Sequence, residues 1–221
     1  MNSNATVFVV ILSSNSVHLD ATHLNDDSLI IQKRIWALVS RCNDTNAFID
    51  VVPAMNSLTV YLSNPAELEK WQTTLAQWWD EIDPQQHQGT HHKIITHYGG
   101  DFGPDLNFVA DAHGLSPKQV IELHSSAHYQ VLFLGFQPGF VYLHGLNEQL
   151  HTPRRATPRT HVTKGSVAIG ASQTGIYPAD SPGGWHIIGH TDFTLFNCHA
   201  NPPSVIQPGD TLQFVCLESA L

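Results

Sequence analysis

The sequence predicts two domains, an α+β domain over residues 1–85 followed by a β-barrel domain over residues 92–221. Three observations lead to this prediction. Strand-like apolar runs alternate with amphipathic helical patterns in the first part of the chain. A polar segment without any periodic pattern, Asp83–Lys93, comes next. From Val131 onward the chain has only short apolar runs separated by Gly and Pro turns, which is typical of a barrel or sandwich.

The first half of the α+β domain contains two strands and a helix. Val7–Leu12 and Ser16–Leu19 are short apolar or alternating runs of the kind that form strands. Asp26 or Asp27 can cap the helix that follows, because a carboxylate oxygen accepts hydrogen bonds from the free amides of the first turn. Apolar residues then repeat with a period of about 3.6. They are Leu29, Ile30, Ile35, Trp36, Leu38 and Val39, and we expect this side of the helix to be buried.

The second half of this domain repeats that order. Phe48–Val52 and Leu58–Leu62 predict strands joined by a turn at PAMN. Asn64 and Pro65 open a second helix, since a side-chain cap followed by proline at the first helical position is a preferred start. The residues expected to pack into the core from this helix are Leu68, Trp71, Leu75, Trp78 and Trp79.

The barrel domain begins with a strand and two short helices. The strand is predicted at Ile94–Tyr98, and the helices at Pro104–His113 and Ser116–Ser125. Ser116 followed by Pro117 repeats the cap-plus-proline start. The later strands are predicted in the runs VLFLGF, SVAIG, WHIIG, FTLF and TLQFVCL.

The composition argues against several classes of function. Ten Lys and Arg stand against nineteen Asp and Glu, whereas nucleic-acid binding requires a broad basic surface. Cys42, Cys198 and Cys216 are far apart and form no CxxC pair, which favours reduced thiols and a cytoplasmic protein. Val7–Leu12 is too short for a signal peptide, and no segment reaches the roughly 20 apolar residues of a membrane span. We therefore expect a soluble protein that binds neither nucleic acid nor membrane.

The scarce positive charge is concentrated in the segment PRRATPR, Pro153–Arg159. It contains Arg154, Arg155 and Arg159, whose planar guanidinium groups fit the oxygens of a carboxylate or phosphate. The cluster indicates a pocket for a small anion. A set of β-turns with arginines that face solvent is the structural alternative.

Two further segments have the composition of a binding pocket. GFQPGF and TGIYPADSPGGW combine glycines, which let backbone amides approach a ligand, with aromatic rings that carry a polar edge. A barrel rim with a packed tryptophan would have the same composition. The residues predicted to bind a substrate beside the arginines are Gly135, Phe136, Pro138, Gly139, Gln173, Tyr177, Gly183, Gly184 and Trp185.

Other catalytic and metal-binding motifs are weak. The pair His124 and His128 lacks the glutamate of HExxH, and His186 and His190 lie in a predicted strand, where their spacing keeps the side chains apart. The sequence has no GxSxG elbow and no GxxxxGK[ST] phosphate loop. We expect no metal site. His124, near the end of a predicted helix, is the best histidine for a polar site, although a capping or core histidine is the more common role.

A series of motifs along nearly the whole chain resembles one protein family. The motifs are QKRIW, YGGDFGPDL, LSPKQVIELHSS, FLGFQPGFVYL, LHTPRRATPR, KGSVAIG, QTGIYP, SPGGW and IIGHT. They resemble the 5-oxoprolinase B-subunit family, also called allophanate hydrolase subunit 1, which includes an inhibitor of sensor histidine kinases. The resemblance implies that the β-barrel domain is cyclophilin-like.

The resemblance also implies a function. In the family, a complex with subunits A and C hydrolyses 5-oxo-L-proline to L-glutamate with ATP cleavage. ATP with Mg²⁺ would then act in the assembled complex, none would bind tightly to this chain, and the chain would be inactive alone. Two alternatives from the same family stay open: a module that inhibits a sensor histidine kinase, and a carboxyltransferase-type module related to urea carboxylase and allophanate metabolism.

Roles within that reaction follow from residue types. Arg154, Arg155 or Arg159 would hold the substrate carboxylate or a phosphate, and the glycine-rich backbone would bind the charged oxygen. His124 would transfer a proton and Arg155 would be catalytic. We therefore expect Arg155→Ala to abolish 5-oxoproline-dependent ATP turnover by the complex.

Overall fold

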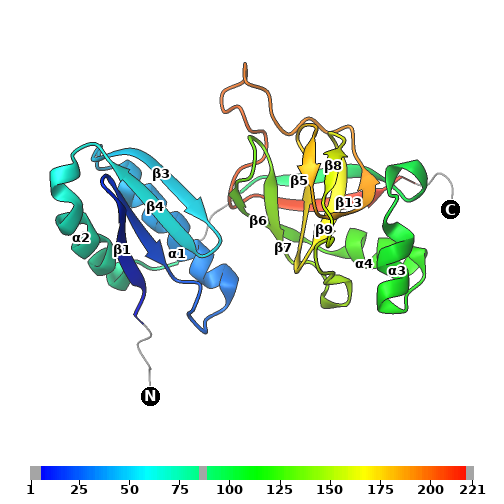
Figure 1. Cartoon of the computed structure of the whole chain (residues 1–221), viewed down its shortest axis with the longest axis horizontal. Coiled ribbons are helices and arrows are strands. Elements are labelled where there is room, and N and C mark those ends of the chain that lie inside the picture. The colour runs from blue at the N-terminus through cyan, green and yellow to red at the C-terminus, as the bar shows by residue number, and fades with distance from the viewer. Residues whose placement is uncertain (1–5, 85–88, 218–221) are drawn as a thin grey trace. The chain divides into compact units, whose positions relative to one another are not determined.

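The computed structural model describes residues 6–84 and 89–217 and divides the chain into two compact units (Figure 1). These are Met1–His87 and Gln88–Leu221. Of the polar segment Asp83–Lys93, residues 85–88 lie outside the described residues. Each unit encloses its own cluster of buried apolar side chains, so each has a separate core.

The first unit is a four-stranded antiparallel sheet with both helices on one face (Figure 1). Its strands are β1 (Phe8–Ser13), β2 (Ser16–Asp20), β3 (Phe48–Ala54) and β4 (Ser57–Leu62), in the order β1-β2-β4-β3. Helix α1 spans Ser28–Asn43 and helix α2 spans Leu68–Glu81. Every second residue of β2 and β4 is buried against these helices, as the alternation of a half-covered strand requires.

Helix α1 begins where the sequence predicts. Asp27 caps it by accepting hydrogen bonds from the amides of Leu29 at 2.8 Å and Ile30 at 3.3 Å. The prediction that Ile30 is buried is wrong, because Ile30 is 47% exposed. The inward stripe instead follows Ile31 and Ile35, so Ile30 lies about 100° of helical rotation away from it.

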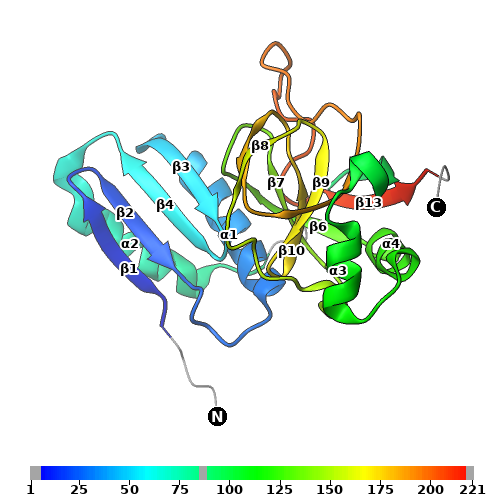
Figure 2. The same cartoon turned by 45° about the vertical axis from the view of Figure 1, so that its right-hand side comes forward.

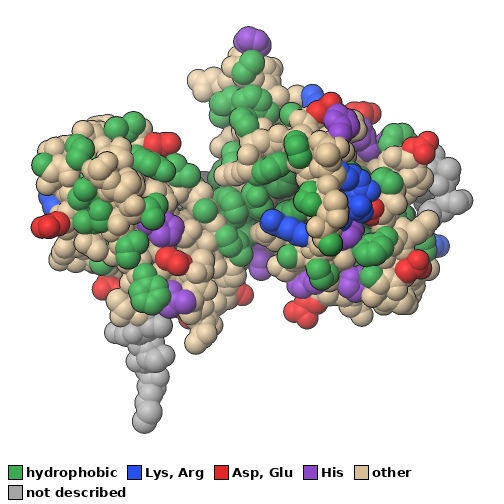
Figure 3. Space-filling model, in the orientation of Figure 1, with side chains coloured by type: hydrophobic (Ala, Val, Ile, Leu, Met, Phe, Trp, Pro, Cys, Tyr) green, Lys and Arg blue, Asp and Glu red, His purple; other side chains and the backbone are tan. Residues whose placement is uncertain are grey.

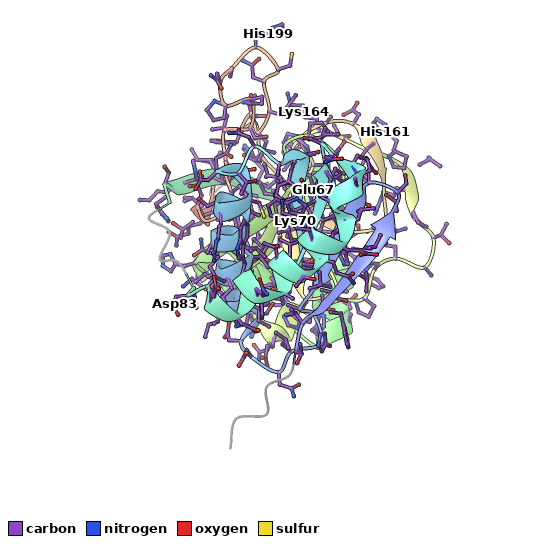
Figure 4. All side chains as sticks on the ribbon, turned by 90° about the vertical axis from the view of Figure 1, so that its left-hand side faces the viewer. Glu67, Lys70, Asp83, His161, Lys164 and His199 are labelled. Carbon is purple, nitrogen blue, oxygen red and sulfur yellow. The ribbon has the colours of Figure 1, made fainter. Side chains whose placement is uncertain are left out.

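Helix α2 begins later than predicted. Asn64 and Pro65 start a 3₁₀ turn, Pro65–Glu67, in which the Asn64 side chain accepts a hydrogen bond from the amide two residues on. The α-helix follows directly at Leu68. Glu67 pairs with Lys70 at 3.0 Å, and both lie on the first turns of this segment (Figure 4).

The second unit is a closed seven-stranded barrel with the strand order β10-β7-β6-β13-β5-β12-β9. Strands β5 and β13 pair in parallel and the other barrel pairs are antiparallel. A separate ribbon pairs β8 with β11. The bounds are β5 His91–Tyr98, β6 Tyr129–Leu134, β7 Val141–His144, β8 Arg159–Val162, β9 Ser166–Gly170, β10 Gln173–Ile176, β11 Ser181–Gly183, β12 His186–His190 and β13 Thr211–Cys216.

Two short helices pack side by side at one end of the barrel (Figure 1, Figure 2). They are α3 (Leu106–His113) and α4 (Pro117–Ser126). Ser116 and Gln119 form a capping box at the start of α4, with each side chain accepting a hydrogen bond from the backbone amide of the other. Apolar residues of both helices join the barrel core, so the helices close that end.

The predicted fold class, an α+β domain followed by a cyclophilin-like β-barrel, is confirmed. One predicted strand is wrong, because FTLF (Phe193–Phe196) is part of the long loop between β12 and β13. There, Phe196 makes an isolated bridge to Ser204, and the loop continues to His199 at its tip (Figure 4). Only Leu195 of this run is fully buried, so its apolar residues reflect packing of a loop rather than a strand.

Candidate functional site

A cavity of about 190 Å³ lies on the barrel unit between the turn after β6, the arginine segment and the β8/β11 ribbon. We call it the aromatic cavity. Its lining residues are Phe136, Phe140, Tyr142, Arg154, Arg155, Pro158, Tyr177, Gly183, Gly184 and Trp185. Lys and Arg side chains are sparse on the face in Figure 3, and most of those visible lie on the barrel unit beside hydrophobic groups.

A tight turn between β6 and β7 places two of the cavity's phenylalanines. The amide of Gln137 donates to the carbonyl of Gly135 at 2.8 Å, and that of Phe140 donates to the carbonyl of Gln137 at 3.0 Å. Gly139 has a φ of 83°, and an added Cβ would lie 2.7 Å from Phe196. Phe136 is left at the mouth, 61% exposed, whereas Phe140 is buried. The glycines of GFQPGF thus shape the turn.

Aromatic rings form the walls of the cavity. The ring of Phe140 lies 5.4 Å from Tyr177 and 5.5 Å from Trp185, both at nearly perpendicular angles. Burial raises the pKa of Tyr177 above its ordinary value, so its hydroxyl stays protonated at neutral pH. These walls present flat apolar surfaces with the polar hydroxyls of Tyr142 and Tyr177.

Gly183 gives Tyr177 the space it occupies. A Cβ at Gly183 would lie 2.3 Å from the Tyr177 hydroxyl oxygen, far inside any contact distance. A Cβ added at the neighbouring Gly184 would lie 3.7 Å from its nearest atom, on Pro158, which is an ordinary contact distance. The carbonyl of Gly184 accepts a hydrogen bond from the amide of Arg155 at 2.8 Å. Only the first of these two glycines is required by close packing.

A buried carboxylate binds two of the three clustered arginines. Asp105, just before α3, accepts a hydrogen bond from Arg155 Nη1 at 3.1 Å. It accepts two from Arg159, through Nη1 at 2.8 Å and Nη2 at 2.9 Å, which is a bidentate pair. The amide of Ile187 on β12 adds a fourth at 2.7 Å. Asp105 therefore connects the arginine segment to α3 and the barrel wall.

The surroundings of Asp105 keep it ionised. Burial raises the pKa of this carboxyl, but the hydrogen bonds from Arg159 and the Ile187 amide, with the charges of Arg159 and Arg155, lower it by more. The pKa is therefore below its ordinary value of 3.8. At neutral pH the group is a carboxylate paired with two guanidinium ions.

Arg154 differs from its neighbours. Its guanidinium carbon lies 5.8 Å from the centroid of the Trp185 ring, within range of a cation–π contact. Among the described residues it has no acidic partner and donates no side-chain hydrogen bond. It lines the cavity with its donors free.

The structure brings together most of the predicted binding residues. Those that line the aromatic cavity are Phe136, Arg154, Arg155, Tyr177, Gly183, Gly184 and Trp185. Gly135, Pro138 and Gly139 shape the turn, Gln173 lies on β10, and Arg159 is held by Asp105 outside the cavity lining. Sequence reasoning missed Phe140, Tyr142 and Pro158. Phe140 could have been found because it ends the GFQPGF motif.

His124 lies apart from the arginines. Its side chain is fully buried on α4, with Nδ1 2.7 Å from the Tyr98 hydroxyl and Nε2 2.8 Å from the Thr174 hydroxyl. Burial lowers its pKa to about 3, so the imidazole is neutral. His124 does not line the aromatic cavity. This placement is that of a core histidine whose two ring nitrogens are both hydrogen-bonded to hydroxyl groups.

The described residues contain no group of three or more His, Cys, Asp or Glu side chains placed to hold a metal ion. His186 is buried and makes a 2.9 Å hydrogen bond to the carbonyl of Pro153, which supports the backbone next to Arg154. His190 contacts the carbonyl of Lys164 instead. In the part of the chain that the structure describes, no helix is long and apolar enough to span a membrane.

Comparison with known proteins identifies the family. Residues 9–206 match the family described as the carboxyltransferase domain, subdomain C and D. The chain is 50% identical to the 5-oxoprolinase B subunit of Escherichia coli O157:H7, over 85% of this chain and 87% of the relative. It is 45% identical to the 5-oxoprolinase B subunit of Haemophilus influenzae, over 83% of this chain and 86% of the relative. The chain belongs to the 5-oxoprolinase B-subunit family.

Two further relatives of this chain are larger proteins that match it over only part of their own length. Urea amidolyase of Saccharomyces cerevisiae is 30% identical over 50% of this chain and 6% of that protein. The crystal structure of TTHA0988 superposes with a TM-score of 0.77 and 29% identity, over 93% of this chain and 40% of that chain. This chain thus spans about two fifths of TTHA0988. The relatives' names as subunits indicate a complex of several subunits.

Proposed function

We propose that this chain is the B subunit of an ATP-dependent 5-oxoprolinase, which hydrolyses 5-oxo-L-proline to L-glutamate together with subunits A and C. The aromatic cavity is the observation that carries the proposal. Its flat rings suit a small planar lactam, and the unpaired Arg154 suits the one carboxylate that this substrate has. Subunit names of relatives up to 50% identical support the same reaction.

ATP supplies the driving force, since opening an unstrained five-membered lactam is unfavourable near neutral pH. The aromatic cavity holds about 190 Å³, whereas pockets for drug-sized ligands begin at about 300 Å³. ATP is therefore larger than the aromatic cavity. We place the nucleotide in another subunit or in a site that another subunit completes.

In this reaction the chain binds 5-oxoproline and orients its lactam group. Rings of Phe140, Tyr177 and Trp185 exclude water from the faces of the lactam. The Tyr177 hydroxyl, which burial keeps protonated, can donate a hydrogen bond to the lactam oxygen. We expect the isolated chain to bind the substrate and to require the partner subunits for turnover.

Reconstitution tests the proposal. The three subunits are co-expressed, and glutamate release from 5-oxoproline is measured with and without this chain. We expect release to require this chain and to return when the purified chain is added back. Undiminished release from subunits A and C alone would remove the chain from the reaction.

A carboxyl-transfer role is the second candidate, because the matched family is described as a carboxyltransferase domain and urea amidolyase is a relative. Avidin separates the two, since it sequesters biotin. Glutamate release that is insensitive to avidin supports the hydrolase, whereas a biotin-dependent transfer of carboxylate by the purified complex supports this alternative.

A further inference from the structure

The three arginines of PRRATPR are held very differently. Arg159 donates through both terminal nitrogens to Asp105, so the edge of its guanidinium formed by Nη1 and Nη2 is occupied. Arg155 donates Nη1 to the same carboxylate and its backbone amide to the Gly184 carbonyl, while its Nε has no hydrogen-bond partner among the described residues. Both side chains are therefore held in place by a carboxylate that is only 7% exposed.

Arg154 has the opposite character. It is exposed, it has no acidic partner among the residues that the structure describes, and it lies over the face of Trp185. A guanidinium in this setting keeps its donors available to an incoming anion, and the indole holds it near the cavity. Charge alone would not distinguish the three arginines, whereas their existing partners do.

We propose that Asp105 gives these arginines different roles. Its ion pairs hold Arg155 and Arg159 in place, whereas Arg154 binds a single carboxylate group of a ring-shaped acid. The inference rests on the proposed function for the identity of that acid and adds the residue that recognises it. Asp105 is a positioning residue, because it acts through the arginines and does not itself line the cavity.

The ion pairs of Asp105 also determine which anions the site prefers. Asp105 cancels one of the two positive charges that Arg155 and Arg159 bring, so the cluster does not present two free forks to a multiply charged oxyanion such as phosphate. A monoanion bound at Arg154 is the ligand that this arrangement favours. Removing the Asp105 charge would release the other arginines and open the site to phosphate.

Binding of three small probes tests the proposal, by calorimetry on the full chain and on the chain co-purified with its partner subunits. The probes are 5-oxo-L-proline, cyclopentanecarboxylate and the carboxylate-free 2-pyrrolidinone. We expect both carboxylates to bind the wild type at least tenfold more tightly than 2-pyrrolidinone. Arg154→Gln should lose that preference. Lys164→Gln removes the same charge from a residue outside the cavity lining and should keep it.

Asp105→Asn tests the positioning role, because the expected result is a higher affinity for phosphate, which an unfolded protein would not show. We expect its affinity for inorganic phosphate to rise at least tenfold over the wild type. Three results would overturn the proposal. Arg154→Gln would bind the carboxylates as tightly as the wild type, or the wild type would bind neither carboxylate in either preparation. The third is an unchanged phosphate affinity in Asp105→Asn. Arg154-dependent binding of cyclopentanecarboxylate without binding of 5-oxoproline would keep this inference and remove the proposed function.

Discussion

Replacing Asp105 with alanine should destabilise the barrel unit more than any exposed acid does. The side chain accepts four hydrogen bonds, three from guanidinium groups and one from the Ile187 amide. Its removal leaves Arg155 and Arg159, whose side chains are 33% and 24% exposed, without their common partner.

The magnitude follows from those contacts. Removing one partner of a buried ion pair costs about 3–5 kcal/mol, and water reaches part of both guanidinium groups, so we expect about 3 kcal/mol for Asp105→Ala. The pH dependence has a defined sign. Because the folded pKa of Asp105 lies below its ordinary value of 3.8, the stabilisation is complete at pH values above 3.8 and is lost as the pH falls through the lower folded pKa.

Hydrogen exchange in increasing urea, followed by mass spectrometry, measures the opening free energy of barrel peptides separately from those of the first unit. Asp192→Ala is the matched control, since the Asp192 side chain is 92% exposed and its carboxylate lies 3.9 Å from the His190 ring. We expect it to change stability by less than about 0.5 kcal/mol. A loss below about 1 kcal/mol for Asp105→Ala would refute the view that this carboxylate organises the wall.

Three further predictions concern single sites. Because the folded pKa of His124 is about 3, stability should fall by about 1.4 kcal/mol per pH unit as the pH drops below 6.5, and His124→Gln should remove that slope in urea titrations at several pH values. Gly183→Ala should displace Tyr177 and weaken 5-oxoproline binding at least tenfold by calorimetry, whereas Gly184→Ala should change it less than threefold; equal effects would contradict the packing argument. Asp27→Ala should cost about 1 kcal/mol in thermal unfolding by losing its helix cap, and an unchanged midpoint would contradict it.

The elements were largely predictable because their signals are local. The alternation in β2 and β4, the capping aspartate of α1 and the Ser-Pro start of α4 each lie within a few residues of the structure they specify. The exceptions have physical reasons. FTLF has the composition of a strand, but its backbone finds partners within its own loop, and composition carries no information about which partner a segment meets.

The segments that surround the candidate site were predictable from the sequence, whereas the contacts among its residues were not. Glycines, aromatics and arginines marked the segments that surround the aromatic cavity, because close approach and anion binding require those residue types. Nothing in PRRATPR distinguishes Arg154 from Arg155, since their roles depend on a carboxylate about fifty residues away in the chain. His124 belongs to one of the motifs and has chemistry suited to a site, but it lies in the core and outside the aromatic cavity.

Asp105 explains why two of the motifs belong together. It is the second aspartate of YGGDFGPDL, and in the sequence it looks like one of many turn-forming acids. In the fold its backbone amide donates to the Ile187 carbonyl at 2.8 Å while its carboxylate accepts from the Ile187 amide, so β12 holds it from both sides. A residue anchored in this way can orient two flexible arginines at little further entropic cost. The arrangement predicts that Asp105→Glu, which lengthens the side chain by one methylene, will bind both arginines in altered positions and weaken carboxylate binding while losing less stability than Asp105→Ala.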